Sequence, residues 1–508
     1  MPKQRLAWFT FAMTTALGLV LAVNCGGQKN HSPDDTADGG PGGSDGGPGS
    51  PDGGTDGGPT DGGGPDGGTD GGTLSFPDAA GWQFYGPQQG GPPEVLGVTS
   101  DPSGNIWVAG GDEGLFLLKP GSPTLHRYTM ADGLRPYGYL PDGGTPVGDK
   151  YTKVISVAGG PMNSVFVGYE GKPSSPHDCE ANLYYDEPGW DPNIFKSGDA
   201  DRVTLEAGDR ISVVHYDIFT GPGQGLADEV IHGGINYGRE KLCTILRIAY
   251  HAPTHSVWFG ANHGFAWGDS AYVRDPNCYG QYRCSGVIEH SHPAINAYAD
   301  ESRTTVILLT GEYHGMSVDP AGDVWVGGAA RSAHFRYATL GGNFFAAGDE
   351  IECDTCARNR LDIWPDRVAE PIYPTPSERV DDNVSDMAAM PDGSVWISSF
   401  TQGLAHYTPG RPTEYRQDTV VDPRGYVDSL ERDPQDGSLW IGYNYGGLAR
   451  LKINNGYIPY DYRALGLDLT QGQILDIQSD NYGGHRRILV AFRGGGGHPG
   501  AIGVYTGD

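Results

Sequence analysis

A formal net charge of −29 over 508 residues, with 63 acidic against 34 basic side chains, excludes two classes of partner at the outset. Nucleic-acid backbones and anionic lipid headgroups are both bound through clustered Lys and Arg, which this composition does not favour. The length allows one large all-β domain or several smaller domains. The 82 glycines are concentrated in one segment, so they do not indicate disorder along the whole chain.

The N-terminus predicts export. Lys3 and Arg5 precede a mostly apolar run that ends at Val23, and Asn24 and Cys25 follow it directly. This arrangement resembles a bacterial lipoprotein signal, in which the Cys is lipidated and becomes the mature N-terminus, although Asn24 departs from the small residue usual before that Cys. Residues 1–25 are therefore interpreted as a signal peptide with Cys25 as the lipidation site. An ordinary cleaved signal peptide and an uncleaved membrane helix are the alternatives.

Residues 26–73 are expected to form a disordered linker. From His31 onward the segment consists of Asp, Gly, Pro, Thr and Ser with a recurring Asp-Gly-Gly, and it has almost nothing to bury. A Ca²⁺ loop is the competing interpretation, but its oxygen ligands need tighter alternating spacing than these Asp residues have. Residues 74–508 are left for the folded domain.

One pattern recurs seven times in the folded part: a short apolar strand, a tight turn, a second strand with a large residue, and a Gly-led third strand. The clearest copy begins at Val95, turns at Asp101-Pro102-Ser103-Gly104 and continues through Trp107 to Leu118. The large second-strand residues are Trp107, Phe166, Trp258, Trp325, Trp396, Trp440 and Leu489. The two shortest spacings, 44 and 49 residues, fit one four-stranded propeller blade, and the longer ones indicate blades with inserted loops.

The fold prediction is therefore an all-β, seven-bladed β-propeller of four-stranded antiparallel blades. The seventh copy has only three strands, of which the last is Ala501–Tyr505. The missing strand is available upstream of the first copy, as Trp82 to Tyr85. An N-terminal strand that completes the last blade is expected to close the domain.

The Asp-Pro-x-Gly-x-x-Trp-Val and Gly-Leu positions, with phrases such as Asp132-Gly133-Leu134, resemble two-component regulator propeller repeats. Such repeats form the periplasmic sensor part of some bacterial hybrid histidine kinases. The resemblance covers roughly residues 82–508, but no transmembrane helix or kinase domain follows the repeats in this sequence. The Gly-x-x-Trp turns are also similar to those of streptogramin lyases, seven-bladed propellers that use a His-based, metal-assisted elimination.

Six further cysteines fall in pairs within the three longest spacings between copies, and an exported chain favours disulfides. We expect three local disulfides, although six Cys allow 15 connectivities. The alternative for the Cys-Asp-Thr-Cys sequence is a redox motif or half a zinc site. The cysteines are Cys179 and Cys243, Cys278 and Cys284, and Cys353 and Cys356.

Candidate ligand-binding residues occupy the turns between second and third strands, which lie at a propeller rim near the axis. They offer mixed polar groups and an aromatic, suited to a polar small molecule, a glycan or a protein partner. Each of them is also an ordinary solvated turn residue in the simplest interpretation. They are Asp112, Glu113, Glu170, Asn262, His263, Arg331, Thr401, Gln402, Asn444 and Tyr445.

The sequence contains no nucleophile elbow, P-loop, metalloprotease helix or dinucleotide fingerprint, so we expect no catalytic residue, no metal site and no cofactor. The leading hypothesis is a monomeric, lipid-anchored binding protein of the outer membrane or the periplasmic face, similar to a sensor. The alternative is a lyase or hydrolase in the central funnel. Convergence of two or more of His255, His263 and His314 with a carboxylate would favour that enzyme. A sensor acting with a separate kinase is a third hypothesis.

Overall fold

All residues that the computed structural model describes lie within Gly72–Asp508, the second of the two units into which the chain divides. The described residues are 80–136, 138, 152–171, 198–216, 244–262, 264–275, 286–291, 294–296, 306–308, 312–328, 332–335, 360–364, 383–400, 403–407, 416–417, 426–444, 447–452, 473–494 and 499–507. The predicted signal peptide, linker and all seven cysteines lie outside these ranges, so the disulfide and lipidation sites remain predictions. Within the ranges, no helix is long and apolar enough to cross a bilayer.

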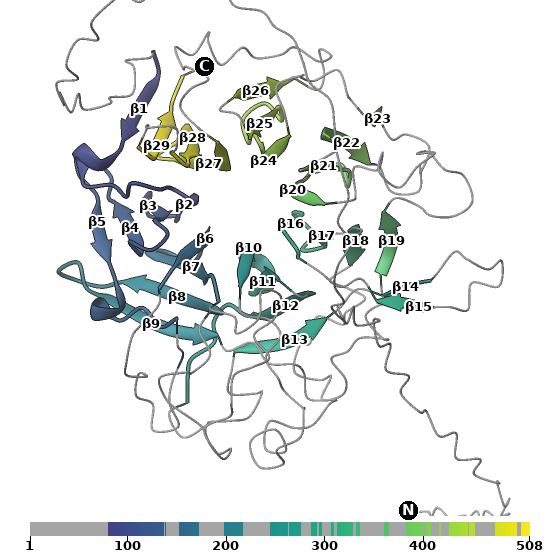
Figure 1. Ribbon diagram of the computed structural model, residues 1–508, viewed down its shortest axis with the longest axis horizontal. Coiled ribbons are helices and arrows are strands. Elements are labelled where there is room, and N and C mark those ends of the chain that lie inside the picture. The colour runs from purple at the N-terminus through teal and green to yellow at the C-terminus, as the bar shows by residue number, and fades with distance from the viewer. Residues whose placement is uncertain are drawn as a thin grey trace, which may run out of the picture. The chain divides into compact units, whose positions relative to one another are not determined.

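The described chain is all-β, with only three short 3-10 helices: η1 (Pro87–Gln89), η2 (Met130–Asp132) and η5 (Ala252–Thr254). Its strands form small antiparallel sheets, as the repeated pattern predicts (Figure 1). The first sheet contains β2 (Gly97–Ser100), β3 (Ile106–Ala109), β4 (Leu115–Leu118) and β5 (His126–Tyr128). The second contains β6 (Val154–Gly159), β7 (Ser164–Tyr169), β8 (Ala200–Leu205) and β9 (Ile211–Tyr216).

The next three sheets repeat this four-stranded order. They are β10 (Ile245–His251), β11 (Ser256–Ala261), β12 (Gly264–Asp269) and β13 (Val287–Ser291); β16 (Gly315–Val318), β17 (Val324–Gly327), β18 (Ser332–Phe335) and β19 (Arg360–Trp364); and β20 (Val384–Ala389), β21 (Val395–Ser399), β22 (Gly403–Tyr407) and β23 (Arg416–Gln417). A separate two-stranded sheet, β14 (Ala294–Asn296) with β15 (Val306–Leu308), was not foreseen from the sequence.

The sixth sheet has three strands among the described residues: β24 (Val427–Arg432), β25 (Leu439–Tyr443) and β26 (Leu448–Leu451). The seventh joins the two ends of the domain. Strand β1 (Trp82–Tyr85) pairs with β29 (Ala501–Tyr505), which continues to β28 (His485–Phe492) and β27 (Ile474–Tyr482). The predicted pairing of Trp82 to Tyr85 with the last strand is confirmed, with Trp82 opposite Tyr505.

The first strand of each sheet contacts the first strand of the next, in the order β2, β6, β10, β16, β20, β24 and β27, and β27 contacts β2 in turn. Figure 1 shows these strands toward the middle, with later strands farther out. The space between neighbouring sheets is filled by large side chains. Trp107, for example, is fully buried and packs with Val154 and Val165 of the following sheet. Burial of such faces is the main favourable term in folding.

The turn after each first strand explains the Asp and Gly of the repeat. Gly104 has φ +82°, a conformation that disfavours other residues, and a Cβ atom there would lie 2.3 Å from the Tyr482 ring. The Arg487 guanidinium of β28 donates to the Gly104 carbonyl at 3.2 Å. This Gly is therefore required both for the turn and for the contact between the first and seventh sheets.

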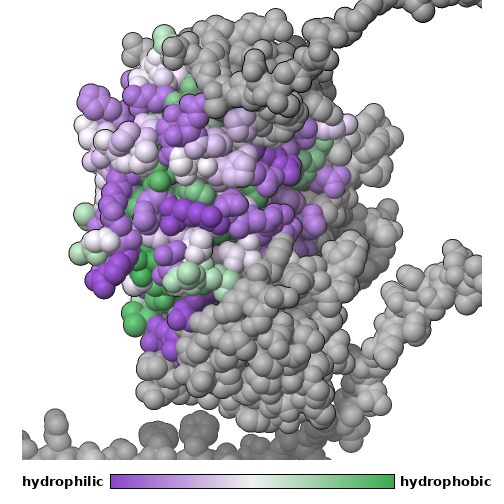
Figure 2. Space-filling view, turned by 60° about the vertical axis from the view of Figure 1, so that its left-hand side comes forward, coloured by the Kyte–Doolittle hydropathy of each residue, from purple (hydrophilic) through white to green (hydrophobic). Residues whose placement is uncertain are grey.

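The outer side of the domain is mostly hydrophilic where the structure describes it. Figure 2 shows hydrophobic residues as small separate patches among hydrophilic ones on this side. Single exposed apolar residues are normal for soluble surfaces. Buried charged and polar side chains, in contrast, lie along the first strands of the sheets.

Candidate binding site at the starts of the first strands

The starts of the first strands lie at a common end of the sheets. Four backbone bonds show this, because each joins the start of a first strand to the end of a second strand in the preceding sheet or close to it. They are Gly111 N to Val154 O at 3.0 Å, Tyr313 N to Ala261 O at 2.9 Å, Val384 N to Gly328 O at 3.2 Å, and Val95 N to Arg493 O at 3.3 Å. Groups at these starts therefore share one surface.

Five of the first strands shift register after their first residue, so that one residue is skipped in the pairing. Such a bulge bends the strand and redirects a side chain. The skipped residues are Ile155, Leu246, Ser385, Asp428 and Leu475. In the other two copies Leu96 and His314 occupy the same place, because Val95-Leu96-Gly97-Val98 aligns with Tyr313-His314-Gly315-Met316.

We call the seven bulge-position residues, together with the residue two positions before each of them, the mouth. The preceding residues are Glu94, Lys153, Thr244, Glu312, Asn383, Tyr426 and Gln473. Sequence reasoning missed this set, although every member lies at or just before the start of a first strand and could have been found from that position. The mouth combines both charges, amides, a hydroxyl and an exposed aromatic ring.

Three of the predicted turn residues bond directly to the mouth. Glu170 N donates to Lys153 O at 2.9 Å, and the two side chains form an ion pair at 2.8 Å. Asn262 N donates to Thr244 O at 3.1 Å. Asn444 N donates to Tyr426 O at 2.9 Å. The structure thus places these candidates just outside the residues that line the mouth.

The other predicted candidates are placed differently. Asp112 is exposed in the turn between β3 and β4, and Glu113 in the same turn pairs with Arg127 at 2.7 Å. Another group lies outside the described residues, so its role stays a prediction: His263, Arg331, Thr401, Gln402 and Tyr445.

The residue after each bulge-position residue lies below the mouth. At this position three charged side chains connect sheets that are far apart in sequence. Arg247 of β10 reaches Asp476 of β27 at 3.1 Å and Asp386 of β20 at 3.0 Å. Its Nε also donates to the His314 carbonyl at 3.1 Å. The two carboxylates are buried, and each accepts a backbone N–H from the next sheet, Asp476 from Val98 and Asp386 from Leu430. We call Arg247, Asp386 and Asp476 the crossing.

The same position in the other sheets carries only small residues: Gly97, Ser156, Gly315 and Ser429. A Cβ on Gly97 would lie 3.4 Å from an Asp476 oxygen, and one on Gly315 would lie 2.4 Å from Val384. The serines link sheets instead: Ser156 Oγ donates to Ile245 O at 2.6 Å and Ser429 Oγ to Ile474 O at 3.1 Å. The small residues leave room for one long Arg side chain between two Asp.

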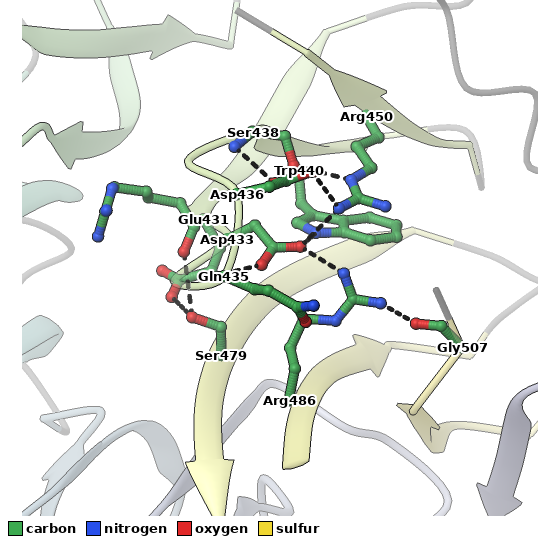
Figure 3. Close-up of polar contacts among 11 residues, drawn as sticks. Glu431, Asp433, Gln435, Asp436, Ser438, Trp440, Arg450, Ser479, Arg486 and Gly507 are labelled. Carbon is green, nitrogen blue, oxygen red and sulfur yellow. Dashed lines mark hydrogen bonds and ion pairs between the residues drawn. The ribbon is translucent and has the colours of Figure 1, made fainter. Parts of the chain in front are cut away.

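Burial of several carboxyl groups around one guanidinium favours their protonated forms. It raises the pKa of Asp386 to about 7 and that of Asp476 above its ordinary value, against the lowering effect of Arg247. The pKa of Glu431, on β24, is raised to about 8 by burial and by the neighbouring Asp386 and Asp476. Its carboxylate accepts a hydrogen bond from Ser479 Oγ (Figure 3). The crossing and Glu431 are therefore a proton-binding group as well as a cross-link.

A second buried network joins the sixth and seventh sheets (Figure 3). Asp433 Oδ2 accepts from Trp440 Nε1 at 3.1 Å, from Arg450 at 2.9 Å and from Arg486 of β28 at 2.9 Å. Arg486 also donates to the Gly507 carbonyl and lies over the Tyr505 ring. This network binds β24–β26 to the sheet that β1 completes, and all its charges are paired, which fits a structural role.

Asp428 differs from the other polar residues of the mouth. It is 3% exposed, and its Oδ2 accepts from Gln473 Nε2 at 2.5 Å. Its Oδ1 is buried and has no partner with hydrogen-bond distance and angle among the described residues, although the Asn444 side chain lies near enough to lower the pKa. Burial raises the pKa of Asp428 to about 6, although Gln473, Asn444 and Arg493 lower it. An unpaired buried acceptor costs about 1–3 kcal/mol, so a donor supplied from outside would be favourable.

His255 and His314, the described members of the predicted histidine set, do not come together. His255 follows the end of β10 in the turn to β11, whereas the His314 carbonyl contacts Arg247 near the start of β10. His314 pairs with Glu312 at 3.2 Å on the open side, and His251 bonds to Thr254 at 2.8 Å. His255 and His314 therefore lie at opposite ends of β10. Within the described ranges, no three His, Cys, Asp or Glu side chains are placed to hold a metal ion.

Small antiparallel sheets, mostly four-stranded, in a repeated order define a propeller-like all-β protein. No family model and no curated protein matches the chain. Among solved structures, the extracellular domain of a hybrid two-component system from B. thetaiotaomicron matches with a TM-score of 0.45 and 12% identity. The match covers 84% of this chain and 41% of that one, so this chain spans about two fifths of its length. A likeness this distant carries no argument about function.

Proposed function

We propose that the chain is an exported, lipid-anchored, seven-bladed β-propeller that binds a polar ligand or protein partner, like a sensor, without catalysis. The cyclic order of first-strand contacts and the pairing of β1 with β29 support the closed seven-bladed form. The apolar run before Cys25 supports export and anchoring at the outer membrane or the periplasmic face. The repeat resemblance to sensor propellers supports the kind of role.

The observation that carries the binding function is the mouth. Half-buried apolar side chains and hydrogen-bonding groups occur there together, which is typical of ligand sites. Below them the crossing fills the middle with a buried ion group, so the mouth has a polar floor. The predicted turn residues Glu170, Asn262 and Asn444 flank it and would extend the contact surface.

The alternative, a His- and metal-assisted lyase or hydrolase, has less support. It requires at least two histidines and a carboxylate at one place, and His255 and His314 lie at opposite ends of β10. A binding role needs no such convergence.

The test uses the full-length chain in a thermal-shift screen of glycans, peptides, organic anions and organic cations, with and without divalent metal. Binding without catalysis predicts a metal-independent rise in Tm with at least one class, and recovery of the compound unchanged by mass spectrometry. Consumption of a compound, or a shift that requires metal, would favour the enzyme. If no class raises Tm, a protein partner is the remaining ligand, and cross-linking in intact cells is used to find it. The cross-linked product should then be absent in a Glu170→Lys/Asn444→Lys variant.

The anchor is tested separately with Cys25→Ser. Wild type should incorporate labelled fatty acid and sediment with membranes, whereas the variant should remain unlabelled. Labelling that persists in the variant would contradict lipidation at Cys25.

A further inference from the structure

The bulge-position residues of the mouth divide into two arcs of different chemistry. Four consecutive first strands, β27, β2, β6 and β10, carry half-buried aliphatic side chains. These are Leu475, Leu96, Ile155 and Leu246. The next three, β16, β20 and β24, carry His314, Ser385 and Asp428. The bulge positions of the mouth are therefore apolar on four neighbouring strands and polar on the other three.

We infer that the mouth binds a small organic cation: an ammonium group at Asp428 with a hydrocarbon body along the aliphatic arc. The inference rests on the proposed binding function and names its ligand class. It goes beyond the exposed turn residues, because its two determinants are a buried carboxylate and an apolar surface.

Asp428 provides the determinant for charge. Its Oδ1 is a buried acceptor that no described donor reaches with hydrogen-bond geometry, while Oδ2 is already held by Gln473. A charge-assisted hydrogen bond from an ammonium group would satisfy this oxygen. Neutral or anionic ligands lack either the charge or the donor.

The surroundings also favour a cation. Glu94 and Glu312 stand at the mouth with 38% and 61% of their side chains exposed, and the whole chain carries −29. Lys153 and Arg493 are paired with Glu170 and Glu94. Tyr426, whose 46% exposure is unusual for an aromatic, is two residues from Asp428, so their Cα atoms are within about 7 Å. An ammonium group is attracted to the face of such a ring.

The aliphatic arc provides the determinant for the hydrocarbon body. The four aliphatic side chains are only partly buried, so a ligand that removes their remaining surface from water gains free energy. The affinity should therefore depend on the alkyl chain of the ligand, whereas simple counter-ion binding depends only on charge.

The experiment measures binding of n-hexylammonium to the full-length protein by isothermal titration calorimetry at pH 7.5. The comparison probes are methylammonium, which lacks the body, 1-hexanol, which lacks the charge, and hexanoate, which reverses it. Hexylammonium should bind at least about tenfold more tightly than each of the other three. Asp428→Asn should weaken it about tenfold, and so should Leu475→Ser, with melting temperatures recorded to verify folding.

Asp112→Asn, which removes an exposed carboxylate of another turn, is the matched control and should leave the affinity unchanged. Binding should also be weaker at pH 5, where Asp428, whose pKa is raised to about 6, gains a proton. Equal affinity of hexylammonium for wild type and Asp428→Asn, or equal affinity for hexanol, would overturn the inference. If hexylammonium does not bind but another class in the thermal-shift screen does, the binding function stands and this ligand class is wrong.

Discussion

Trp107 Nε1 donates a hydrogen bond to Asp101 Oδ2 at 2.9 Å, and this contact links the turn of the repeat to its core. The same carboxylate accepts from Asn105 and from the backbone of Ser103. In the sixth sheet, Trp440 bonds to Asp433 in the same way at 3.1 Å. In these two sheets the Asp of the motif thus satisfies the polar atom of the Trp that fills the gap between sheets.

Replacing Asp101 by Ala should lower the free energy of unfolding by about 1–3 kcal/mol, because it leaves the buried indole N–H unpaired. Urea denaturation measures the change. Asp112→Ala, an exposed carboxylate in the next turn of the same sheet, should change it by less than about 0.5 kcal/mol. Equal effects of the two substitutions would show that the Asp101 bond is not stabilising.

This part of the fold could be predicted from the sequence because it is local. Asp101 and Trp107 are six residues apart, so their relation recurs as a readable pattern. The pairing of β1 with β29 was also predictable. The seventh copy of the pattern has only three strands, and the strand Trp82–Tyr85 before the first copy belongs to no other sheet. The first strand of the first copy begins at Gly97 rather than Val95, because Val95 bonds to Arg493 of the neighbouring sheet instead.

Replacing Arg247 by Met should lower the free energy of unfolding by about 3–5 kcal/mol at pH 7.5, because Asp386 and Asp476 remain buried without their cation. Chemical denaturation gives the value. At pH 5 the loss should shrink, since both carboxyls can then be protonated. A triple variant with Asp386→Asn and Asp476→Asn should recover part of the stability. A loss that is independent of pH would contradict the assigned role of the charge.

The crossing could not be predicted from the sequence. Its three members are separated by 139 and 90 residues and no short motif contains two of them. Their contact depends on the distance across the first strands, which is set by how the sheets pack. In the sequence, the crossing is marked only by Arg or Asp at a position where the other copies have Gly or Ser. This difference can be recognised only after the first strands are aligned on their bulges.

Stability should fall as pH rises from about 5 to about 8. Asp386 and Glu431 have ordinary pKa values of 3.8 and 4.5 and are raised to about 7 and about 8 in the folded protein. The folded state therefore holds more protons than the unfolded state within this window, so raising the pH favours unfolding. Burial lowers the pKa of His215, but hydrogen bonds and charges from Asp199 and Asp201 raise it from 6.5 to about 9. Loss of this proton therefore also lowers stability at the upper end of the pH range.

Thermal unfolding followed by circular dichroism between pH 5 and pH 8 measures this dependence. Glu431→Gln should flatten the curve, because the amide cannot lose a proton. Asp112→Asn should leave the slope unchanged. A melting temperature that rises with pH in the wild type would contradict the protonation states assigned to this group.

The pairing of the first strand with the last sheet is the contact on which the proposed closed propeller depends most. Gln83 and Val504 are directly opposite in the pairing of β1 with β29, a geometry that brings Cβ atoms within about 5.5 Å. The test is a Gln83→Cys/Val504→Cys variant, oxidised in dilute solution and mapped by peptide mass spectrometry. We predict an intramolecular disulfide between these positions and little between Cys at 83 and 502, a pair out of register. Absence of the 83–504 bond, or its appearance only between two molecules, would contradict the closed arrangement.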